Sequence, residues 1–207
     1  MRFRAASGAM LGLAMASPVL AQSKDEKRTV LYAEGLAGQV VAAIPLTLVL
    51  RDTTVRDPAL PADRLALARW ADSVVGDALL VGAPSVNWVL GPELRRMARR
   101  SAGLVPEPER MGQAVMRAHN LERVPDPLRS SLRTLMAMAG GRHAFIPAAL
   151  TLTRDAEGAL RATLAAVLVD ARLGQVLWRG EGVGSGPGGA EAIQAAVAAL
   201  LPPPSGS

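Results

Sequence analysis

The clearest hydrophobic pattern of the chain lies between residues 144 and 184, where three consecutive strands are predicted. Phe145 to Arg154 is largely apolar and ends at a turn that contains Gly158. From Leu160 to Asp170 the apolar residues recur at every second position, which is typical of a strand with one buried face. This stretch is the centre around which the rest of the domain is expected to pack.

The third strand of this segment follows a short connection. Residues 170–174 form a five-residue hairpin loop in which Gly174 is the residue suited to a positive φ. Gln175 to Val183 then returns as a strand, and Val176 and Trp178 are expected to share a face. The three strands together predict an antiparallel meander.

The most apolar stretch outside the meander is Val40 to Leu50, which predicts a strand buried on both faces. Pro45 lies inside it and lacks the N–H that a sheet requires. We therefore expect one long strand that is bent or interrupted at Pro45, and a second short strand over residues 85–90.

Helical periodicity predicts the cover of the sheet. Residues 62–80 form an amphipathic pattern with Trp70 on the apolar face, and residues 190–201 form an Ala-rich one. Between them, a short basic helix begins at Pro92, a second short helix spans residues 106–120, and a third has Asp126 as its N-cap and ends at Gly140. Trp70 and Trp178 are expected to be mostly buried.

These elements predict a mixed α+β fold in the broader α/β class. It consists of a central mixed sheet with a C-terminal three-stranded antiparallel meander, covered by Ala-rich helices. At 207 residues, half of them apolar, the chain is long enough for one well-buried domain. The expected organisation is a signal peptide over residues 1–21, a lead-in over 22–39, a single domain over 40–201 and a disordered tail over 202–207.

The amino terminus supports export. Arg2 and Arg4 precede an uncharged run that ends at Val19-Leu20-Ala21, which is the three-part pattern of a secretory signal peptide. The run is shorter than the roughly 20 apolar residues of a membrane anchor. We expect cleavage before Gln22, a periplasmic or secreted mature protein, and no transmembrane span after cleavage.

Composition excludes several kinds of site. The chain contains no cysteine, so disulfides, thiolate metal sites and lipid attachment through cysteine are ruled out. The net charge of +5 falls to +3 without Arg2 and Arg4, and aromatic residues make up only 3 % of the chain. With so little on which bases stack, binding to nucleic acid is not predicted.

One nucleotide-binding motif is matched by residue type but not by its predicted structural context. Residues 184–189 satisfy G-x-G-x-x-G between a predicted strand and a predicted helix. A dinucleotide fold needs a further parallel strand and an acidic residue about 20 positions later, and both are missing here. The glycines are therefore interpreted as a flexible turn, and no cofactor is expected.

The residues that could perform acid–base chemistry lack the usual spacing. His119 and His143 have no partner at metal-binding or nucleophile-elbow distance, so both are expected to be structural. Asp63, Asp72 and Asp77 lie on the polar side of the predicted helix and are expected to be solvated. No catalytic or metal-binding residue is predicted.

Arg95, Arg96, Arg99 and Arg100 form the one dense cluster of charge, on the short basic helix whose apolar side includes Met97. Such a cluster is usually an ordinary solvated face. Alternatively, its guanidinium groups bind an envelope protein or an anionic cell-wall or lipid surface. The four arginines are the candidate partner contact.

The order of these pieces resembles the bacterial envelope domains of the CsgG, LpoB and TolB amino-terminal type. The resemblance rests on the element ending in Pro45, the helix that closes at Gly140-Gly141, and the hairpin from Val169 to Trp178. It implies a non-enzymatic module in periplasmic assembly or in regulation of cell-wall synthesis. The absence of cysteine and of long amphipathic hairpins means that lipid anchoring and pore formation do not carry over.

Two functions remain open on the sequence. The favoured one is an exported interaction module of the CsgG, LpoB and TolB amino-terminal type. The alternative is an exported small-ligand binder or hydrolase. The two differ in an observable property, because an enzyme should have a deep pocket with converging polar groups, whereas an interaction module should have a shallow apolar or charged patch.

Overall fold

The computed structural model describes residues 30–31 and 33–201. The predicted signal peptide, half of the lead-in and the predicted tail lie outside the described residues. Within them the fold is mixed α+β, with a six-stranded mixed sheet as predicted. The elements in chain order are η1 (Ala33–Leu36), β1 (Val40–Ala43), β2 (Val49–Arg51), α1 (Arg64–Gly82), β3 (Asn87–Val89), α2 (Gly91–Arg100), η2 (Pro108–Arg110), η3 (Gln113–Arg117), α3 (Leu128–Ala139), β4 (His143–Arg154), β5 (Leu160–Asp170), β6 (Gln175–Gly186) and α4 (Gly189–Ala198).

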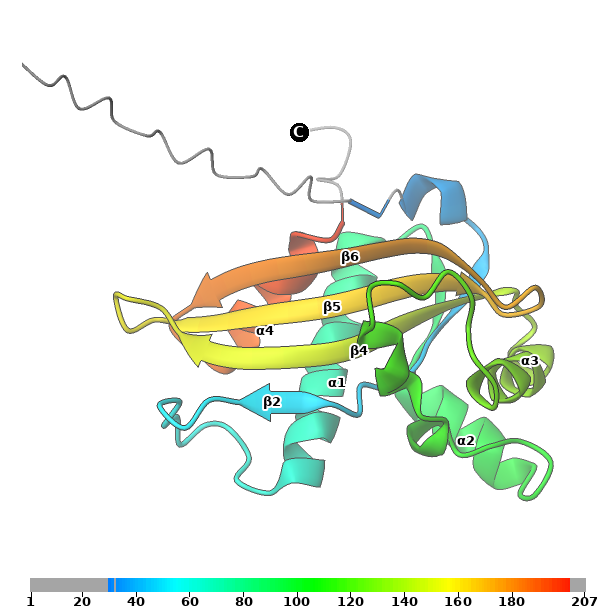
Figure 1. Cartoon of the computed structure of the whole chain (residues 1–207), viewed down its shortest axis with the longest axis horizontal. Helices are drawn as coiled ribbons and strands as arrows, with labels where there is room; N and C mark the ends of the chain where they lie inside the picture. The colour runs from blue at the N-terminus through cyan, green and yellow to red at the C-terminus, as the bar shows by residue number, and fades with distance from the viewer. Residues whose placement is uncertain (1–29, 32, 202–207) are drawn as a thin grey trace, which may run out of the picture.

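The sheet has the order β3-β1-β4-β5-β6, and β2 also pairs with β4. The strands β1 and β2 run parallel to β4, whereas β4, β5 and β6 form the predicted antiparallel meander. In Figure 1 these three long strands cross the middle of the molecule, with α1 and α4 on one face and the 108–117 segment in front of the other. Helices therefore cover both faces.

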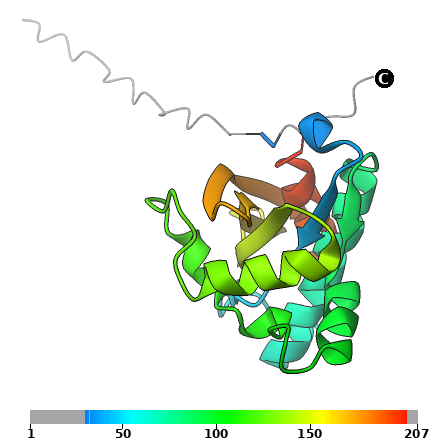
Figure 2. The same cartoon turned by 90° about the vertical axis from the view of Figure 1, so that its right-hand side faces the viewer.

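Two hydrophobic cores fill the space on the two sides of the sheet. The first contains the alternating residues Leu160 to Leu168 together with α1 and α4. The second contains Val167, Val169 and the buried residues of α2 and α3. The predicted alternation in β5 is confirmed. Val167 and Val169, which lie between the alternating residues near the end of the strand, are buried as well, because a second helical layer covers them. Figure 2 shows α3 on that side of the sheet.

The apolar run from Val40 to Leu50 forms two short strands. The N–H of Ile44 donates to Phe145 O, and the ladder with β4 resumes where Leu150 N donates to Leu48 O. Pro45 lies in the gap, as expected for a residue without an N–H. The prediction of an interruption is confirmed, and Leu50 turns out to be exposed.

The glycine-rich end of β6 is a packing surface for α4. A Cβ added at Gly182 would lie 2.0 Å from Ala196 O, and one added at Gly184 would lie 2.3 Å from Ala196 N. The alternate glycines of β6 thus allow the backbone of α4 to approach the sheet directly. The interpretation of residues 184–189 as a flexible turn is corrected, because β6 extends to Gly186 and only the segment before Gly189 connects it to the helix.

A β-bulge corrects the predicted faces of β6. The register shifts so that Trp178 lies opposite Leu168 while Val176 lies opposite Val169, which leaves Leu177 as the extra residue. Trp178 consequently packs against the first core and Val176 against the second. The prediction that the two share a face is wrong, since a bulge inverts the alternation.

Two other local predictions are revised. Residues 106–120 form the two 3₁₀ segments η2 and η3 instead of one helix. The N-cap position of α3 is Pro127, and the Asp126 carboxylate accepts from the Ser130 hydroxyl instead of a backbone N–H. The prediction that Trp70 and Trp178 are mostly buried is confirmed, and both pack against the first core. The helix end is confirmed, because Gly140 is left-handed with φ 75°.

Candidate interaction surface

The basic helix α2 is held in place through one narrow apolar side. Leu94 and Ala98, four residues apart, are buried in the second core, and Met97 packs partly against it. Arg96, Arg99 and Arg100 are exposed. The sequence predicts a helix that packs through Met97 and presents its arginines to solvent. This prediction holds for three of the four arginines.

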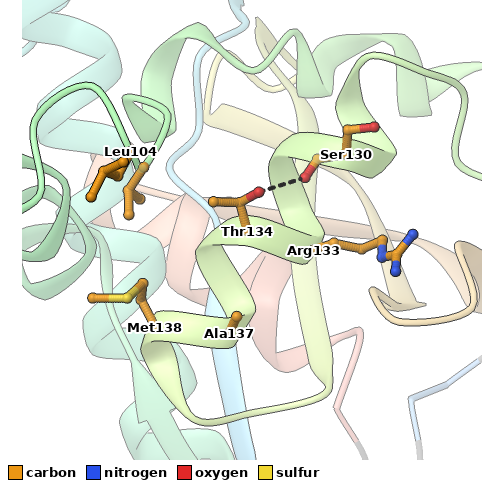
Figure 3. Close-up of a pocket in the computed structure, with 7 residues that line it drawn as sticks. Leu104, Ser130, Arg133, Thr134, Ala137 and Met138 are labelled. Atoms are coloured by element: carbon orange, nitrogen blue, oxygen red, sulfur yellow. Dashed lines mark hydrogen bonds between the residues drawn. The ribbon is translucent and has the colours of Figure 1, made fainter.

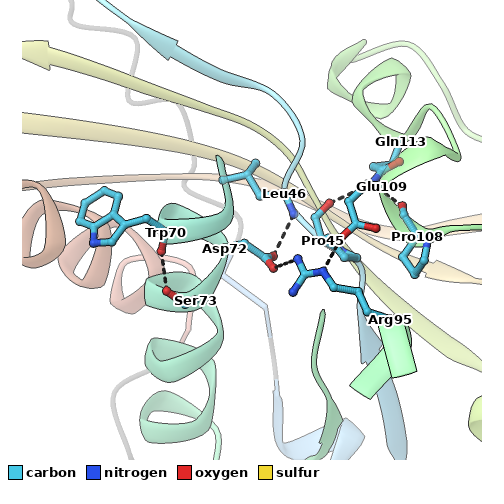
Figure 4. Close-up of polar contacts among 9 residues, drawn as sticks. All are labelled: Pro45, Leu46, Trp70, Asp72, Ser73, Arg95, Pro108, Glu109 and Gln113. Atoms are coloured by element: carbon cyan, nitrogen blue, oxygen red, sulfur yellow. Dashed lines mark hydrogen bonds and ion pairs between the residues drawn. The ribbon is translucent and has the colours of Figure 1, made fainter. Parts of the chain in front are cut away.

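Arg95 has a different environment, shown in Figure 4. Its Nη2 donates to Asp72 Oδ2 at 2.8 Å, and its Nε donates to Glu109 Oε1. The side chains of Arg95 and Asp72 are 23 % and 10 % exposed. Arg95 thus links α2 to α1 and to η2, and it is not available to a partner in the way that its three neighbours are.

Asp72 is the carboxylate that the sequence placed wrongly. The helix pattern predicts that it is solvated like Asp63 and Asp77, but its Oδ1 accepts the backbone N–H of Leu46 at 2.9 Å and its Oδ2 accepts from Arg95. Burial raises the pKa of Asp72, and the hydrogen bonds from Leu46 and Arg95 oppose that rise. Asp63 instead caps α1 by accepting the N–H of Ala66.

Gln113 completes this support, and no sequence pattern distinguishes it. Its buried amide donates to Pro45 O at 2.8 Å and to Pro108 O at 2.9 Å. The first bond holds the segment where the ladder between β1 and β4 is interrupted, and the second holds the start of η2. The base of the α2 surface is therefore fixed by Asp72, Arg95, Glu109 and Gln113 together.

A groove of about 550 Å³ lies between the loop after α2 and the outer side of α3. Leu104 and Met138 are its most exposed apolar residues, at 80 % and 52 %. In Figure 3, Thr134 and Met138 point toward Leu104, while Arg133 leaves α3 in the other direction. The lining residues are Leu104, Val105, Ser130, Arg133, Thr134, Ala137 and Met138.

The two segments that border this groove are rich in arginine, and one carboxylate, that of Asp126, lies beside them and accepts from the hydroxyl of the groove-lining Ser130. Residues 94–106 and 128–142 contain seven arginines and no aspartate or glutamate. Arg95 and Arg142 are paired, to Asp72 with Glu109 and to Asp170, respectively. Within the described part of the chain none of the other five makes an ion pair. We call the surface formed by Arg96, Arg99, Arg100, Leu104, Arg133 and Met138 the α2–α3 face; Leu104, Arg133 and Met138 line the groove itself, and Arg99, at the edge of the face, also lines a hollow on the other side of α2.

A second hollow, of about 620 Å³, lies on the other side of α2, between that helix, α1 and η2. It is lined by the exposed Leu65 and by Arg69 and Arg99, together with the Glu107–Arg110 pair at 3.3 Å. Charges of both signs meet there. Its electrostatic character is therefore mixed, in contrast to the α2–α3 face.

The histidines lie apart from both hollows. His119 is exposed, in a loop beside the sheet, where it lines a third hollow, of about 570 Å³, with Leu50, Thr151 and Glu181. His143 begins β4 opposite Asp170, and burial lowers its pKa. Burial raises the pKa of Asp170, but the hydrogen bonds from Arg142 and from the backbone N–H groups of Leu173 and Arg172 outweigh it, so the net shift is downward.

The shape of the surface bears on the choice between enzyme and interaction module. The hollow beside the buried Asp72 has a volume of only about 80 Å³, below the several hundred Å³ of ordinary ligand pockets, whereas the hollows of about 550, 570 and 620 Å³ reach that size but lie open on the surface. Among the described residues, no three histidine, aspartate or glutamate side chains are grouped to hold a metal ion. No described helix has both the length and the hydropathy to span a bilayer.

Comparison with known proteins gives structural likenesses alone. No family model matches the chain, and no curated protein matches it either. The LpoB C-terminal domain from Salmonella enterica is 12 % identical over 71 % of this chain and 82 % of that one, with a TM-score of 0.39. A PelC dodecamer from Paraburkholderia phytofirmans is 12 % identical, covers 84 % and 90 %, and has a TM-score of 0.36.

Lipoprotein GNA1162 from Neisseria meningitidis is also similar, at 14 % identity over 72 % of this chain and 81 % of that chain, with a TM-score of 0.33. The likeness to LpoB-type domains implied by the sequence thus recurs among solved structures. Identities and TM-scores at this level carry no argument about function. What the chain does has to be inferred from its own residues.

Proposed function

We propose that this protein is an exported, non-enzymatic module of the cell envelope that binds an acidic partner protein through the α2–α3 face. The single observation that carries the proposal is the charge of that face. Five of its seven surrounding arginines make no ion pair within the described residues, and the two segments themselves contain no carboxylate, although Asp126 lies just outside them and accepts from Ser130. A surface potential of one sign attracts a partner of the opposite sign.

A protein is the favoured partner because the face combines arginine with exposed apolar side chains. Arginine and methionine are enriched in protein–protein interfaces, and Leu104 and Met138 are exposed beside the arginines. An anionic lipid or cell-wall surface would need the charge but not the groove. Binding to anionic vesicles is therefore the outcome that separates the two kinds of partner.

Replacing Arg96, Arg99, Arg100 and Arg133 together by glutamine is expected to remove the capture of envelope proteins and to leave the fold intact. Arg95 is excluded from this set because it supports α1 and η2. The matched control replaces Arg56, Arg117, Arg161 and Arg172, which are exposed elsewhere and change the net charge equally. The proteins captured from envelope extract by each variant are compared at low salt and at physiological salt, where exposed charges are screened beyond about 8 Å.

The expected pattern is loss of partners in the α2–α3 variant, retention in the control, and weaker capture by the unmodified protein as salt rises. Equal capture by both variants would contradict the proposal. So would binding of the unmodified protein to phosphatidylglycerol vesicles, with none to phosphatidylcholine vesicles and no protein captured. That result would assign the face to lipid.

A further inference from the structure

We propose that the groove between Leu104 and α3 receives an amphipathic helix of the partner, with an apolar side in the groove and carboxylates along the flank next to Arg133. This inference rests on the proposed function, because it identifies the structure and chemistry of the segment that the α2–α3 face binds. Each part of it follows from the groove lining.

The two walls of the groove are apolar where they face each other. Leu104 and Met138 supply the largest exposed surface, and Ala137 is exposed between them and Arg133. Thr134 adds a methyl group, because its hydroxyl already donates to Ser130 O at 3.1 Å within α3 (Figure 3). An unbranched methionine adapts its shape to different apolar anchors.

The groove offers no backbone to an extended segment. The N–H groups of Leu104 and Val105 both donate to Ser101 O, and the peptide groups along α3 are used within the helix. Strand addition requires a row of free backbone groups, whereas a helix docks through side chains alone. The surface therefore favours a docked helix over an added strand.

The dimensions and the charge agree with this form. The 12 residues of α3 extend about 18 Å, which corresponds to a partner helix of roughly three turns with anchors at positions i, i+4 and i+7. Arg133 lines the groove on its α3 side and extends away from Leu104, so it borders the outer flank of the groove. Arg133 is exposed, and Arg129 is partly buried against Gly174. Carboxylates on one flank of the partner helix would meet Arg133 first.

The test uses three synthetic peptides and fluorescence anisotropy, with circular dichroism to follow helix formation. The probe peptide has leucines at i, i+4 and i+7 and glutamates along one flank. The second peptide has the same composition with a central proline, which prevents the helix. The third has glutamine in place of glutamate. Each is titrated to about 1 mM, so that affinities as weak as about −4 kcal/mol are detected.

Three protein variants accompany the unmodified chain. The groove variant replaces Leu104 and Met138 by serine. Its control replaces Val81 and Leu80 of α1, which are exposed to similar degrees, at 82 % and 45 %, and do not line the groove. The third replaces Arg133 by glutamine. We expect the probe peptide to gain helicity on binding, the groove variant to bind at least about tenfold more weakly, and Arg133→Gln to weaken the probe but not the glutamine peptide.

The outcomes separate this inference from the function on which it rests. If the probe and the proline peptide bind equally, or if the groove variant binds as tightly as the unmodified chain, the claim that a helix docks in the groove is wrong. A loss of affinity in Arg133→Gln would still support an acidic partner in that case. A second outcome would overturn the acidic flank. In it, the groove variant loses binding, but the glutamine peptide binds as tightly as the probe peptide and Arg133→Gln does not change the affinity. No binding of any peptide would overturn the inference, while the capture experiment on envelope proteins would still test the function.

Discussion

Replacing Gly184 by valine is expected to lower the free energy of unfolding by about 3 kcal/mol or more, the upper part of the range for overpacking. An added Cβ meets the backbone of α4 at Ala195 and Ala196, between 2.3 and 2.5 Å away, and a backbone cannot move aside as a flexible side chain can. The helix would have to leave the sheet and expose part of the first core. Urea denaturation followed by circular dichroism measures the effect.

Gly35→Ala is the matched control, because no atom lies within 4 Å of a Cβ added there. We expect its midpoint to stay within experimental error of the unmodified protein. If Gly184→Val unfolds at the same urea concentration as this control, α4 does not lie against β6 as closely as described here, and the role assigned to the glycine stripe is wrong.

Replacing Arg95 by methionine is expected to destabilise the protein by about 3 kcal/mol at neutral pH, because Asp72 would be left as a buried carboxylate with Leu46 as its remaining donor. The pKa of Asp72 is already raised from its ordinary value of 3.8 by burial, and Arg95 is one of the groups that lower it. Without Arg95 the pKa rises further. The loss of stability should therefore depend on pH.

The direction follows from linkage between proton binding and folding. A carboxyl group with a raised folded-state pKa contributes stability below its unfolded pKa, and this contribution is lost as the pH rises through the folded-state pKa. The deficit of Arg95→Met relative to the unmodified protein should be largest near pH 7 and should shrink toward pH 4, as Asp72 takes up a proton. Urea midpoints across this range measure it.

Adding Asp72→Asn to Arg95→Met provides the control. The asparagine still accepts from Leu46 but carries no charge, so the double variant should recover most of the loss at pH 7 and show no shrinking deficit on acidification. A deficit of Arg95→Met that stays constant from pH 4 to pH 7 would mean that Arg95 acts through packing of its side chain and not through Asp72.

The sequence predicted the meander well because its alternation is long and one face is buried. The sequence does not predict the bulge at Leu177, because one extra residue in a strand cannot be recognised from the order of apolar and polar residues. Asp72 was misplaced for a similar reason. On the helix it belongs to the polar side, and only the tertiary structure brings Leu46 and Arg95 against that side.

The candidate surface was predicted in part. The arginines of α2 are visible as a charge cluster, but Leu104, Arg133 and Met138 are separated from them in sequence and come together through the packing of α2 against α3. A possible signal was the absence of any carboxylate from residues 94–106 and 128–142. Such an absence becomes informative only once the two segments are known to be neighbours.

The most direct test of the central claim is site-specific photo-cross-linking in cells that produce the protein. A photoreactive phenylalanine analogue is placed at Leu104 in one variant and at Leu177, on the exposed bulge of β6, in another. The account predicts a cross-link from position 104 to an acidic segment of an envelope protein, lost when Arg96, Arg99, Arg100 and Arg133 are also replaced by glutamine. Cross-links that form from position 177 and not from position 104 would contradict it.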